Sequence, residues 1–199
     1  EYLGRNWEPS PVSPGRLDAV LLTHAHLDHC GLLPRLVREG YRGPIYTTAA
    51  SADLAELILR DSADIQAEDT AYKKKRHRKE GRRGKHPVKP IYTMRDVDRT
   101  LPLLQPVSYG QKVAVNDHIT AYFHDAGHIL GSASAEMVFD PDRSGNTLRM
   151  LFSGDLGPEH KVFHPEPDAP EGFDYVVCEA TYGDRERDDY TIESRRETL

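Results

Sequence analysis

The stretch that decides the fold is His24-Ala25-His26-Leu27-Asp28-His29. It holds three histidines and one aspartate, and it follows directly on an apolar, strand-like run from Leu17 to Thr23. Imidazole nitrogens and carboxylate oxygens are the ligands that Zn²⁺ and similar ions prefer, and no pair of thiolates lies nearby in the sequence. Because such groups are costly to bury unpaired, the pattern indicates a metal site rather than packing.

The spacing of these side chains suggests two ions rather than one. If the segment stays extended after the strand, His24 and His26 point to the same side and can bind one ion together. Asp28 lies on that side but further along, and His29 points away from it, so this pair is expected to reach a second ion. Two adjacent ions can activate one bridging water, which makes a hydrolytic centre the first hypothesis.

Length and composition describe a soluble protein. The chain has 199 residues, of which 29% are charged and 38% are hydrophobic. No run approaches the roughly 18 apolar residues that a membrane helix requires, and no signal-peptide pattern opens the chain, so no membrane partner is expected. With only two cysteines, Cys30 and Cys178, a disulfide framework is not expected and the predicted location is the cytoplasm. Cys30 is expected to be a small buried residue, not a ligand.

The charge is unevenly distributed. Residues 73–89 contain ten Lys or Arg and one acid, a local balance of +9 in a chain whose formal net charge is −6, so the other residues carry −15. A basic patch on an acidic body suggests a polyanionic substrate, although a solvated or disordered loop is the alternative. The residues expected to contact nucleic acid are Lys73, Lys74, Lys75, Arg76, Arg78, Arg82 and Arg83.

Helical and strand patterns occur in mixed order, which predicts an α+β fold. Helices are expected at 32–37, ending before Gly40, at 51–68, and after a capping box formed by Thr93 and Asp96. The basic stretch between the last two is read as a linker or exposed arm. The expected strands are 45–47, a hairpin spanning 113–123, a second hairpin spanning 134–153, and 175–179.

Two of these strands run into further candidate ligands. The strand at 119–123 leads to Gly127 and His128, and the strand ending at Ser153 leads to Gly154 and Asp155. A glycine beside each candidate lets the backbone turn tightly. His128 could instead be a turn histidine, and Asp155 a turn residue. The other histidines are assigned to the surface or to the basic arm: His118, His124 and His160 to the surface, and His77 and His86 to the arm.

The sequence also resembles a known protein family. Four segments together are similar to the metallo-β-lactamase superfamily, and specifically to its β-CASP branch of nucleic-acid processing nucleases, most of all the bacterial RNA-processing exonuclease type. The segments are His24 to His29, Ala126-Gly127-His128-Ile129-Leu130-Gly131-Ser132, Ser153 to Gly157, and Glu179-Ala180-Thr181-Tyr182-Gly183-Asp184. The resemblance runs from about Leu17 to Gly183.

The resemblance implies a fold, a cofactor and a set of roles. The fold would be an αββα sandwich, and the cofactor two zinc ions, with Mn²⁺ as the alternative. By motif, His24, His26 and His128 would bind one ion, Asp28 and His29 the other, and Asp155 would bridge them. Asp28 would also take part in catalysis, together with Glu179, which orients a histidine supplied later in the family's chains.

The sequence also departs from the family. The opening strands, the β-CASP cap and the C-terminal part are not in this sequence, so the implied sandwich is incomplete and the chain is interpreted as an internal piece. The expected organisation is a leading loop at 1–16, a metallo-β-lactamase domain at 17–183 with a basic arm at 72–90, and the start of the connection to the cap at 184–199.

The function that follows as a hypothesis is zinc-dependent hydrolysis of phosphodiester bonds in single-stranded RNA, with a hydroxide bridging the two metals as the nucleophile. DNA is not excluded as a substrate, and a homodimer is one option for the assembly. Two alternatives remain open: a small-molecule hydrolase of the lactonase or thioesterase type on the same fold, and a non-catalytic RNA-binding fragment.

Overall fold

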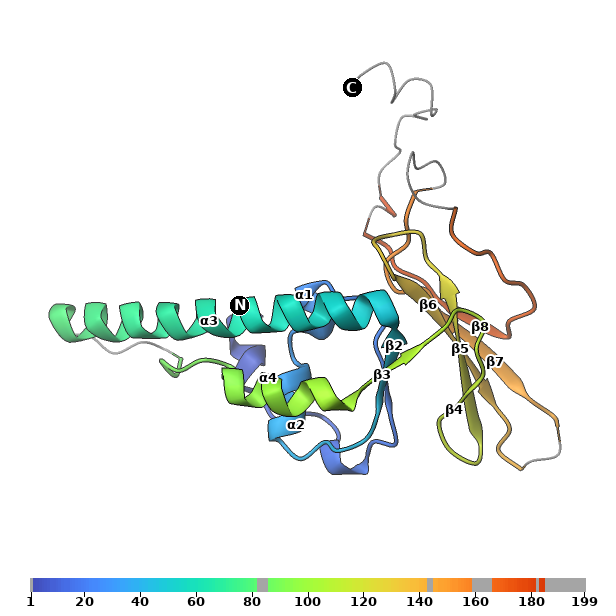
Figure 1. Ribbon diagram of the computed structural model, residues 1–199, viewed down its shortest axis with the longest axis horizontal. Helices are drawn as coiled ribbons and strands as arrows, with labels where there is room; N and C mark the ends of the chain where they lie inside the picture. The colour runs from blue at the N-terminus through green and yellow to red at the C-terminus, as the bar shows by residue number, and fades with distance from the viewer. Residues whose placement is uncertain (1, 82–85, 143–144, 159–165, 182, 185–199) are drawn as a thin grey trace, which may run out of the picture. The chain divides into compact units, whose positions relative to one another are not determined.

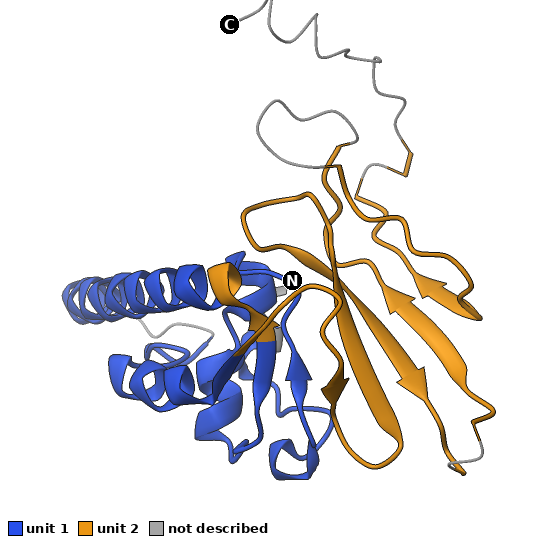
Figure 2. Cartoon of the chain, turned by 45° about the vertical axis from the view of Figure 1, so that its right-hand side comes forward, with its two compact units in different colours: residues 1–46, 52–105 blue, residues 47–51, 106–199 orange. Residues whose placement is uncertain are grey.

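The computed structural model describes residues 2–81, 86–142, 145–158, 166–181 and 183–184 (Figure 1). The chain falls into two compact units. Unit 1 comprises residues 1–46 and 52–105, and unit 2 comprises residues 47–51 and 106–199 (Figure 2). The predicted connection at 184–199 lies outside the described residues after Asp184.

Unit 1 is built from helices around the start of a small sheet. The sheet has the order β1 (Val20–Leu21), β2 (Ile45–Thr48), β3 (Leu104–Val107), and β1 runs parallel to β2. Strand β1 is shorter than the predicted strand at 17–23. The chain passes into unit 2 within β2 and again within β3.

Helices supply most of the core of unit 1. They are η1 (Tyr2–Trp7), η2 (Pro14–Arg16), α1 (Leu27–Cys30), α2 (Leu33–Arg38), α3 (Ala49–Glu80), α4 (Met94–Thr100) and η3 (Leu101–Leu103), of which α3 begins in unit 2. Leu59 of α3 and Val97 of α4 are fully buried beside Ile45. Tyr41 and Tyr92 are buried in the same cluster.

Two of the predicted helix boundaries are confirmed. Gly40 follows α2 with a φ of 119°, a value that glycine adopts readily and other residues rarely do. The Asp96 carboxylate accepts hydrogen bonds from the Thr93 backbone N–H (2.9 Å) and from the Thr93 hydroxyl (2.8 Å). A complete capping box therefore begins α4.

The basic arm differs from the prediction. Helix α3 does not end near residue 68 but continues to Glu80, so the first part of the arm is helical rather than a linker. Neither glycine nor proline interrupts residues 69–80, and the pairs Asp69–Lys73 (3.3 Å) and Arg76–Glu80 (4.0 Å) have the i,i+4 spacing that supports a helix. Gly81, with a φ of 59°, follows the last turn. In Figure 1 this half of α3 projects beyond the other elements of unit 1.

Unit 2 is a five-stranded sheet. Its order is β4 (Val113–Ala114), β5 (Ile119–Asp125), β6 (Ala133–Phe139), β7 (Leu148–Phe152), β8 (Tyr175–Val177). The first four strands are antiparallel and confirm both predicted hairpins, whereas β8 joins β7 in parallel. Ala121, Phe123 and Ala135 face the buried side. Side chains of β8 are 50–58% exposed.

The mixed order of helices and strands confirms the α+β prediction. None of the helices in the described part of the chain combines the length and apolar character that crossing a membrane requires.

Candidate metal centre

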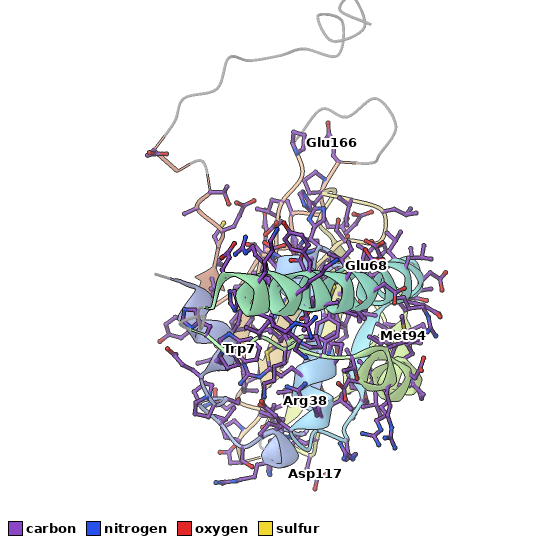
Figure 3. All side chains as sticks on the ribbon, turned by 90° about the vertical axis from the view of Figure 1, so that its left-hand side faces the viewer. Trp7, Arg38, Glu68, Met94, Asp117 and Glu166 are labelled. Atoms are coloured by element: carbon purple, nitrogen blue, oxygen red, sulfur yellow. The ribbon has the colours of Figure 1, made fainter. Side chains whose placement is uncertain are left out.

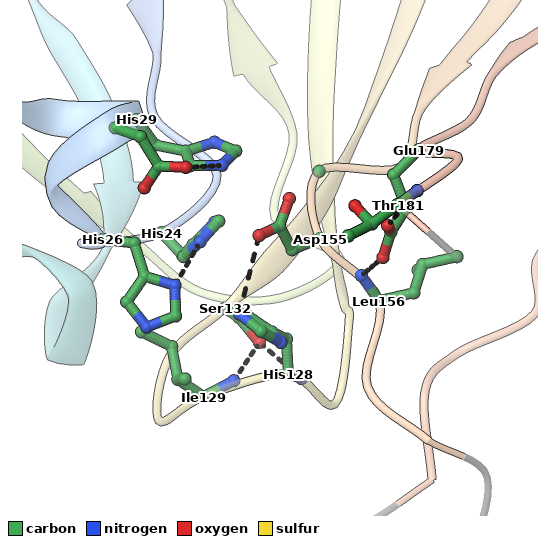
Figure 4. A network of polar contacts seen from close by, with 12 residues as sticks. His24, His26, His29, His128, Ile129, Ser132, Asp155, Leu156, Glu179 and Thr181 are labelled. Atoms are coloured by element: carbon green, nitrogen blue, oxygen red, sulfur yellow. Dashed lines mark hydrogen bonds and ion pairs between the residues drawn. The ribbon is translucent and has the colours of Figure 1, made fainter. Parts of the chain in front are cut away.

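In unit 1, His24 and His26 come together after β1. His24 is fully buried, and its Nε2 lies 3.0 Å from Nδ1 of His26, with the two rings edge to face (Figure 4). Two nitrogens bound to one tetrahedral zinc at about 2.0–2.1 Å lie roughly 3.3 Å apart. The observed spacing therefore suits a shared ion, and the predicted common orientation of this pair is confirmed.

Asp28 and His29 lie on a helical turn and not on the extended segment that was predicted. The chain does not stay extended after His26, because the His26 carbonyl accepts hydrogen bonds from the backbone N–H groups of His29 (3.0 Å) and Cys30 (2.9 Å), which starts α1. The helical turn brings the His29 ring to 4.0 Å from the His24 ring and its Nε2 to 3.8 Å from Asp28 Oδ2. The Asp28 side chain is 81% exposed.

Cys30 is buried, as predicted for a residue that is not a ligand. Its thiol donates to the Ala25 carbonyl at 3.3 Å, and burial raises the pKa of the Cys30 thiol to about 11. Because metals bind the thiolate and not the thiol, this protonated group is a poor ligand at neutral pH.

In unit 2, His128 and Asp155 come together at the ends of β5 and β7. His128 Nε2 lies 3.7 Å from Asp155 Oδ2 (Figure 4). Glycines with positive φ precede both residues: Gly127 at 59° and Gly154 at 58°. The tight turns that these glycines were predicted to permit are therefore present.

The two ligand loops of unit 2 cross at a very close approach. The Gly157 N–H donates to the Ala126 carbonyl at 2.8 Å, and a Cβ placed on Gly157 would lie 1.7 Å from the Gly127 carbonyl oxygen. No side chain fits at this crossing. Gly157 is thus a positioning residue for the His128–Asp155 pair, a role that the sequence analysis did not assign.

Ser132 holds the loop that carries His128. Its hydroxyl accepts hydrogen bonds from the backbone N–H groups of His128 (2.9 Å) and Ile129 (3.1 Å). The neighbouring Gly131 carbonyl accepts from the hydroxyls of Thr48 (2.6 Å) and Ser51 (2.8 Å). The quoted motif contained both Gly131 and Ser132, but the long-range partners of Gly131, Thr48 and Ser51, have no local sequence signal.

The Glu179 carboxylate has hydrogen-bond partners within unit 2. Its carboxylate accepts hydrogen bonds from the backbone N–H groups of Leu156 (3.0 Å) and Thr181 (3.3 Å). Hydrogen bonds from Thr181 and Leu156, and the nearby His128, lower the pKa of Glu179 below its usual value. Glu179 is therefore held as a carboxylate.

His124 was predicted to be a surface residue, and this prediction is wrong because its side chain is largely buried. Its side chain is 19% exposed, and its Nε2 lies 2.8 Å from the carboxylate of Glu136, which is itself buried. Arg149 donates to the same carboxylate at 2.8 and 2.9 Å. His118 is exposed as predicted, and His160 lies outside the described residues.

The predicted nucleic-acid contacts lie on the outer half of α3. Lys73, Lys74, Lys75, Arg76 and Arg78 are exposed there, whereas Arg82 and Arg83 lie outside the described residues. His77 and His86, assigned to the arm, both line a pocket of unit 1.

Each unit thus assembles its own share of the predicted ligands. Unit 1 gathers His24, His26 and His29 with Asp28 beside them, and unit 2 gathers His128 and Asp155. Donor atoms on His24, His26, His128 and Asp155 are of the kind that hold a metal ion. A mixed α/β fold that presents imidazoles and carboxylates at strand ends is an arrangement that metal-dependent hydrolases use.

The comparisons with known proteins identify the family within that class. Residues 8–138 match the family described as a metallo-beta-lactamase superfamily domain, and the chain belongs to this superfamily. It is 37% identical to Ribonuclease TTHA0252 of Thermus thermophilus over 195 residues, which cover 98% of this chain and 38% of that protein.

Archaeal relatives match as well. The chain is 36% identical to the transcription termination factor FttA of Methanosarcina mazei over 177 residues, or 88% of this chain and 24% of that protein. It is 33% identical to FttA of Methanocaldococcus jannaschii over 168 residues, or 84% of this chain and 23% of that protein. The chain therefore spans well under half the length of these relatives.

Among solved structures, the Rm3 metallo-beta-lactamase aligns with a TM-score of 0.42 and 18% sequence identity, covering 74% of this chain and 46% of that one. Family membership does not depend on this match.

Proposed function

We propose that this chain contributes the metal-binding part of a zinc-dependent phosphodiesterase that cleaves single-stranded RNA. The observation that carries the proposal is the pairing of ligands inside each unit, His24 with His26 and His128 with Asp155, in a member of the metallo-β-lactamase superfamily. The names of its relatives, a ribonuclease and a transcription termination factor, support RNA as the substrate.

The residues present suit two zinc ions, with Mn²⁺ as the alternative. In the proposed site His24, His26 and His128 would hold one ion, Asp28 and His29 would hold the other, and Asp155 would be a ligand as well. When bound, two such ions lower the pKa of a shared water and offset the charge that builds up on a phosphate under attack.

The chain's own residues prepare this chemistry. Ser132 and the Gly127–Gly157 crossing fix the backbone beside His128 and Asp155, so little reorganisation is needed when a ligand binds. Asp28 leaves most of its carboxylate open to solvent, which makes it accessible to a substrate or an attacking water. Glu179 keeps a negative charge near His128 and thereby favours a bound cation there.

The basic half of α3 supplies the electrostatic part of substrate binding. The exposed Lys and Arg side chains between residues 73 and 78 can contact the phosphates of a strand, and such contacts weaken as salt rises. Both cysteines are free thiols, which suits a reducing compartment such as the cytoplasm.

The test compares Asp155→Asn with a matched control, Asp117→Asn, an exposed turn residue of unit 2. Zinc content is measured by mass spectrometry, and turnover is measured on end-labelled single-stranded RNA and on a lactone. We expect wild-type protein and Asp117→Asn to bind zinc and cleave RNA, and Asp155→Asn to lose both properties. Cleavage of the lactone alone would support the small-molecule alternative, and wild-type zinc content in Asp155→Asn would refute the ligand assignment.

A further inference from the structure

A pocket of about 340 Å³ lies within unit 1, between η1, the outer part of α3 and the segment that returns from it. Its wall contains the indole of Trp7, the cations Lys73, Arg76 and Lys89, and the histidines His77 and His86. Figure 3 shows Trp7 next to α3. This site, the Trp7 pocket, is separate from the metal-binding residues described above.

Specific contacts hold the walls of the Trp7 pocket in place. The buried guanidinium of Arg35 donates to the backbone carbonyls of Asn6 and Glu8, the residues on either side of Trp7. The return segment is tied to α3 because the Gln66 side-chain oxygen accepts a hydrogen bond from the Ile91 N–H at 2.8 Å. The pocket is therefore a built feature and not a gap between loosely placed loops.

Positive charge dominates the Trp7 pocket. The acid among its lining residues is Asp69, whose carboxylate lies 3.3 Å from Lys73 Nζ, and Arg76 lies 4.0 Å from Glu80. All four side chains of these pairs are exposed, so the pairs are weak and leave the cations able to bind an added anion.

The aromatic ring gives the pocket a second kind of recognition. Trp7 is partly buried, and Lys89 Nζ lies over its ring, 5.6 Å from the centroid. An aromatic face beside cations is the combination that binds single-stranded nucleic acids, because a base stacks on the ring while its phosphate contacts the charges. An isolated phosphate would use only the cations.

A neighbouring pocket lies next to the metal motif and shares lining residues with the Trp7 pocket. It has a volume of about 360 Å³, is lined by Asp28 and Tyr92, and shares Asn6, Gln66 and Ile91 with the Trp7 pocket. Both pockets lie within unit 1. The Trp7 pocket and the pocket beside Asp28 are therefore adjacent within unit 1.

We propose that the Trp7 pocket binds one nucleotide of single-stranded RNA away from the site of cleavage, with the base against Trp7 and a phosphate among Lys73, Arg76 and Lys89. The strand then continues through the neighbouring pocket to Asp28. This inference rests on the proposed function only in taking RNA as the substrate.

Trp7 reports on its own pocket, since it is the single tryptophan of the chain. Its fluorescence is titrated with a uridine oligomer, with uridine monophosphate and with inorganic phosphate, in a metal chelator so that no cleavage occurs. We expect saturable quenching by the oligomer. Quenching by phosphate but not by the oligomer would overturn the inference.

Variants separate stacking from charge, with affinity measured by the anisotropy of a labelled oligomer. Trp7→Ala is expected to weaken binding by about 5- to 150-fold, the range of one base–aromatic stack, and Trp7→Phe to weaken it less. Lys89→Ala should reduce the salt-dependence slope by about 0.7, the value of one single-strand phosphate contact. Lys112→Ala, an exposed lysine of unit 2, is the matched control.

The outcome is independent of the nuclease assay. Wild-type affinity in Trp7→Ala, with circular dichroism showing a folded chain, would refute the pocket even if RNA is cleaved. Trp7-dependent binding without any cleavage would support the pocket and count against the proposed enzyme.

Discussion

The crossing of Gly157 over Gly127 offers a sharp test of how unit 2 positions its ligands. In Gly157→Ala the new Cβ would lie 1.7 Å from the Gly127 carbonyl oxygen, whereas ordinary contacts begin at 3.4 Å. The two loops must therefore move apart by about 1.7 Å, the difference between 3.4 Å and 1.7 Å. That movement breaks the 2.8 Å hydrogen bond from Gly157 to Ala126.

The size of the effect follows from these two losses. Overpacking costs about 1–3 kcal/mol and a lost hydrogen bond about 1 kcal/mol, so we expect Gly157→Ala to lower the free energy of unfolding by about 2–4 kcal/mol. Because the loops carry His128 and Asp155, zinc affinity should also fall by about 10–100-fold, as it does when the support of a metal ligand is disturbed.

The assay is urea unfolding followed by circular dichroism, together with zinc affinity measured by competition with a coloured chelator. Gly15→Ala is the control, because its Cβ would meet the nearest atom at an ordinary 3.6 Å. Unchanged zinc affinity in Gly157→Ala, with the control also unchanged, would show that the loop crossing does not position the ligands.

Two further predictions concern carboxylates of unit 2. Because the folded pKa of Glu179 lies below the ordinary value of 4.5, the stability that this carboxylate contributes is present above that value and is lost as the pH falls through the folded pKa. NMR titration of the Glu179 carboxyl carbon should give a midpoint below pH 4.5. The free energies of unfolding of wild type and Glu179→Gln should become equal in acid. A titration midpoint at or above pH 4.5 would contradict the assigned hydrogen bonds. Glu136→Ala removes the buried carboxylate that accepts from His124 and Arg149, and it should lower the free energy of unfolding in urea by about 2 kcal/mol or more. The control Glu68→Ala, at an exposed position, should change the free energy of unfolding little. Equal effects of the two substitutions would refute a structural role for the Glu136 carboxylate.

The features predicted correctly from sequence are those with a local cause. The capping box of Thr93 and Asp96 and the glycine after α2 depend on residues a few positions apart. The two hairpins follow from alternation over short runs. The contact of His24 with His26 likewise needs only the period of an extended chain.

The predictions that failed needed information beyond a local pattern. The run of basic residues was read as a linker or an exposed arm; its first part is exposed but helical, because charge does not break a helix that lacks glycine and proline and contains i,i+4 ion pairs. Asp28 and His29 were placed by extending the strand period, although α1 starts at Leu27. His124 was assigned to the surface because its partner, Glu136, lies on the neighbouring strand, and only the pairing register of β5 with β6 brings the two together.

The two ligand sets are therefore held by different physical means. In unit 1, four donors lie within six residues, and a single turn of helix brings His29 back to His24, so few long-range contacts are needed. In unit 2, His128 and Asp155 come from different strands, and their spacing depends on strand register, on Ser132 and on a crossing that accepts only glycine. A substitution in the core of the unit 2 sheet should therefore disturb its ligands more than an equal change in unit 1, because the positions of His128 and Asp155 are set by the sheet itself.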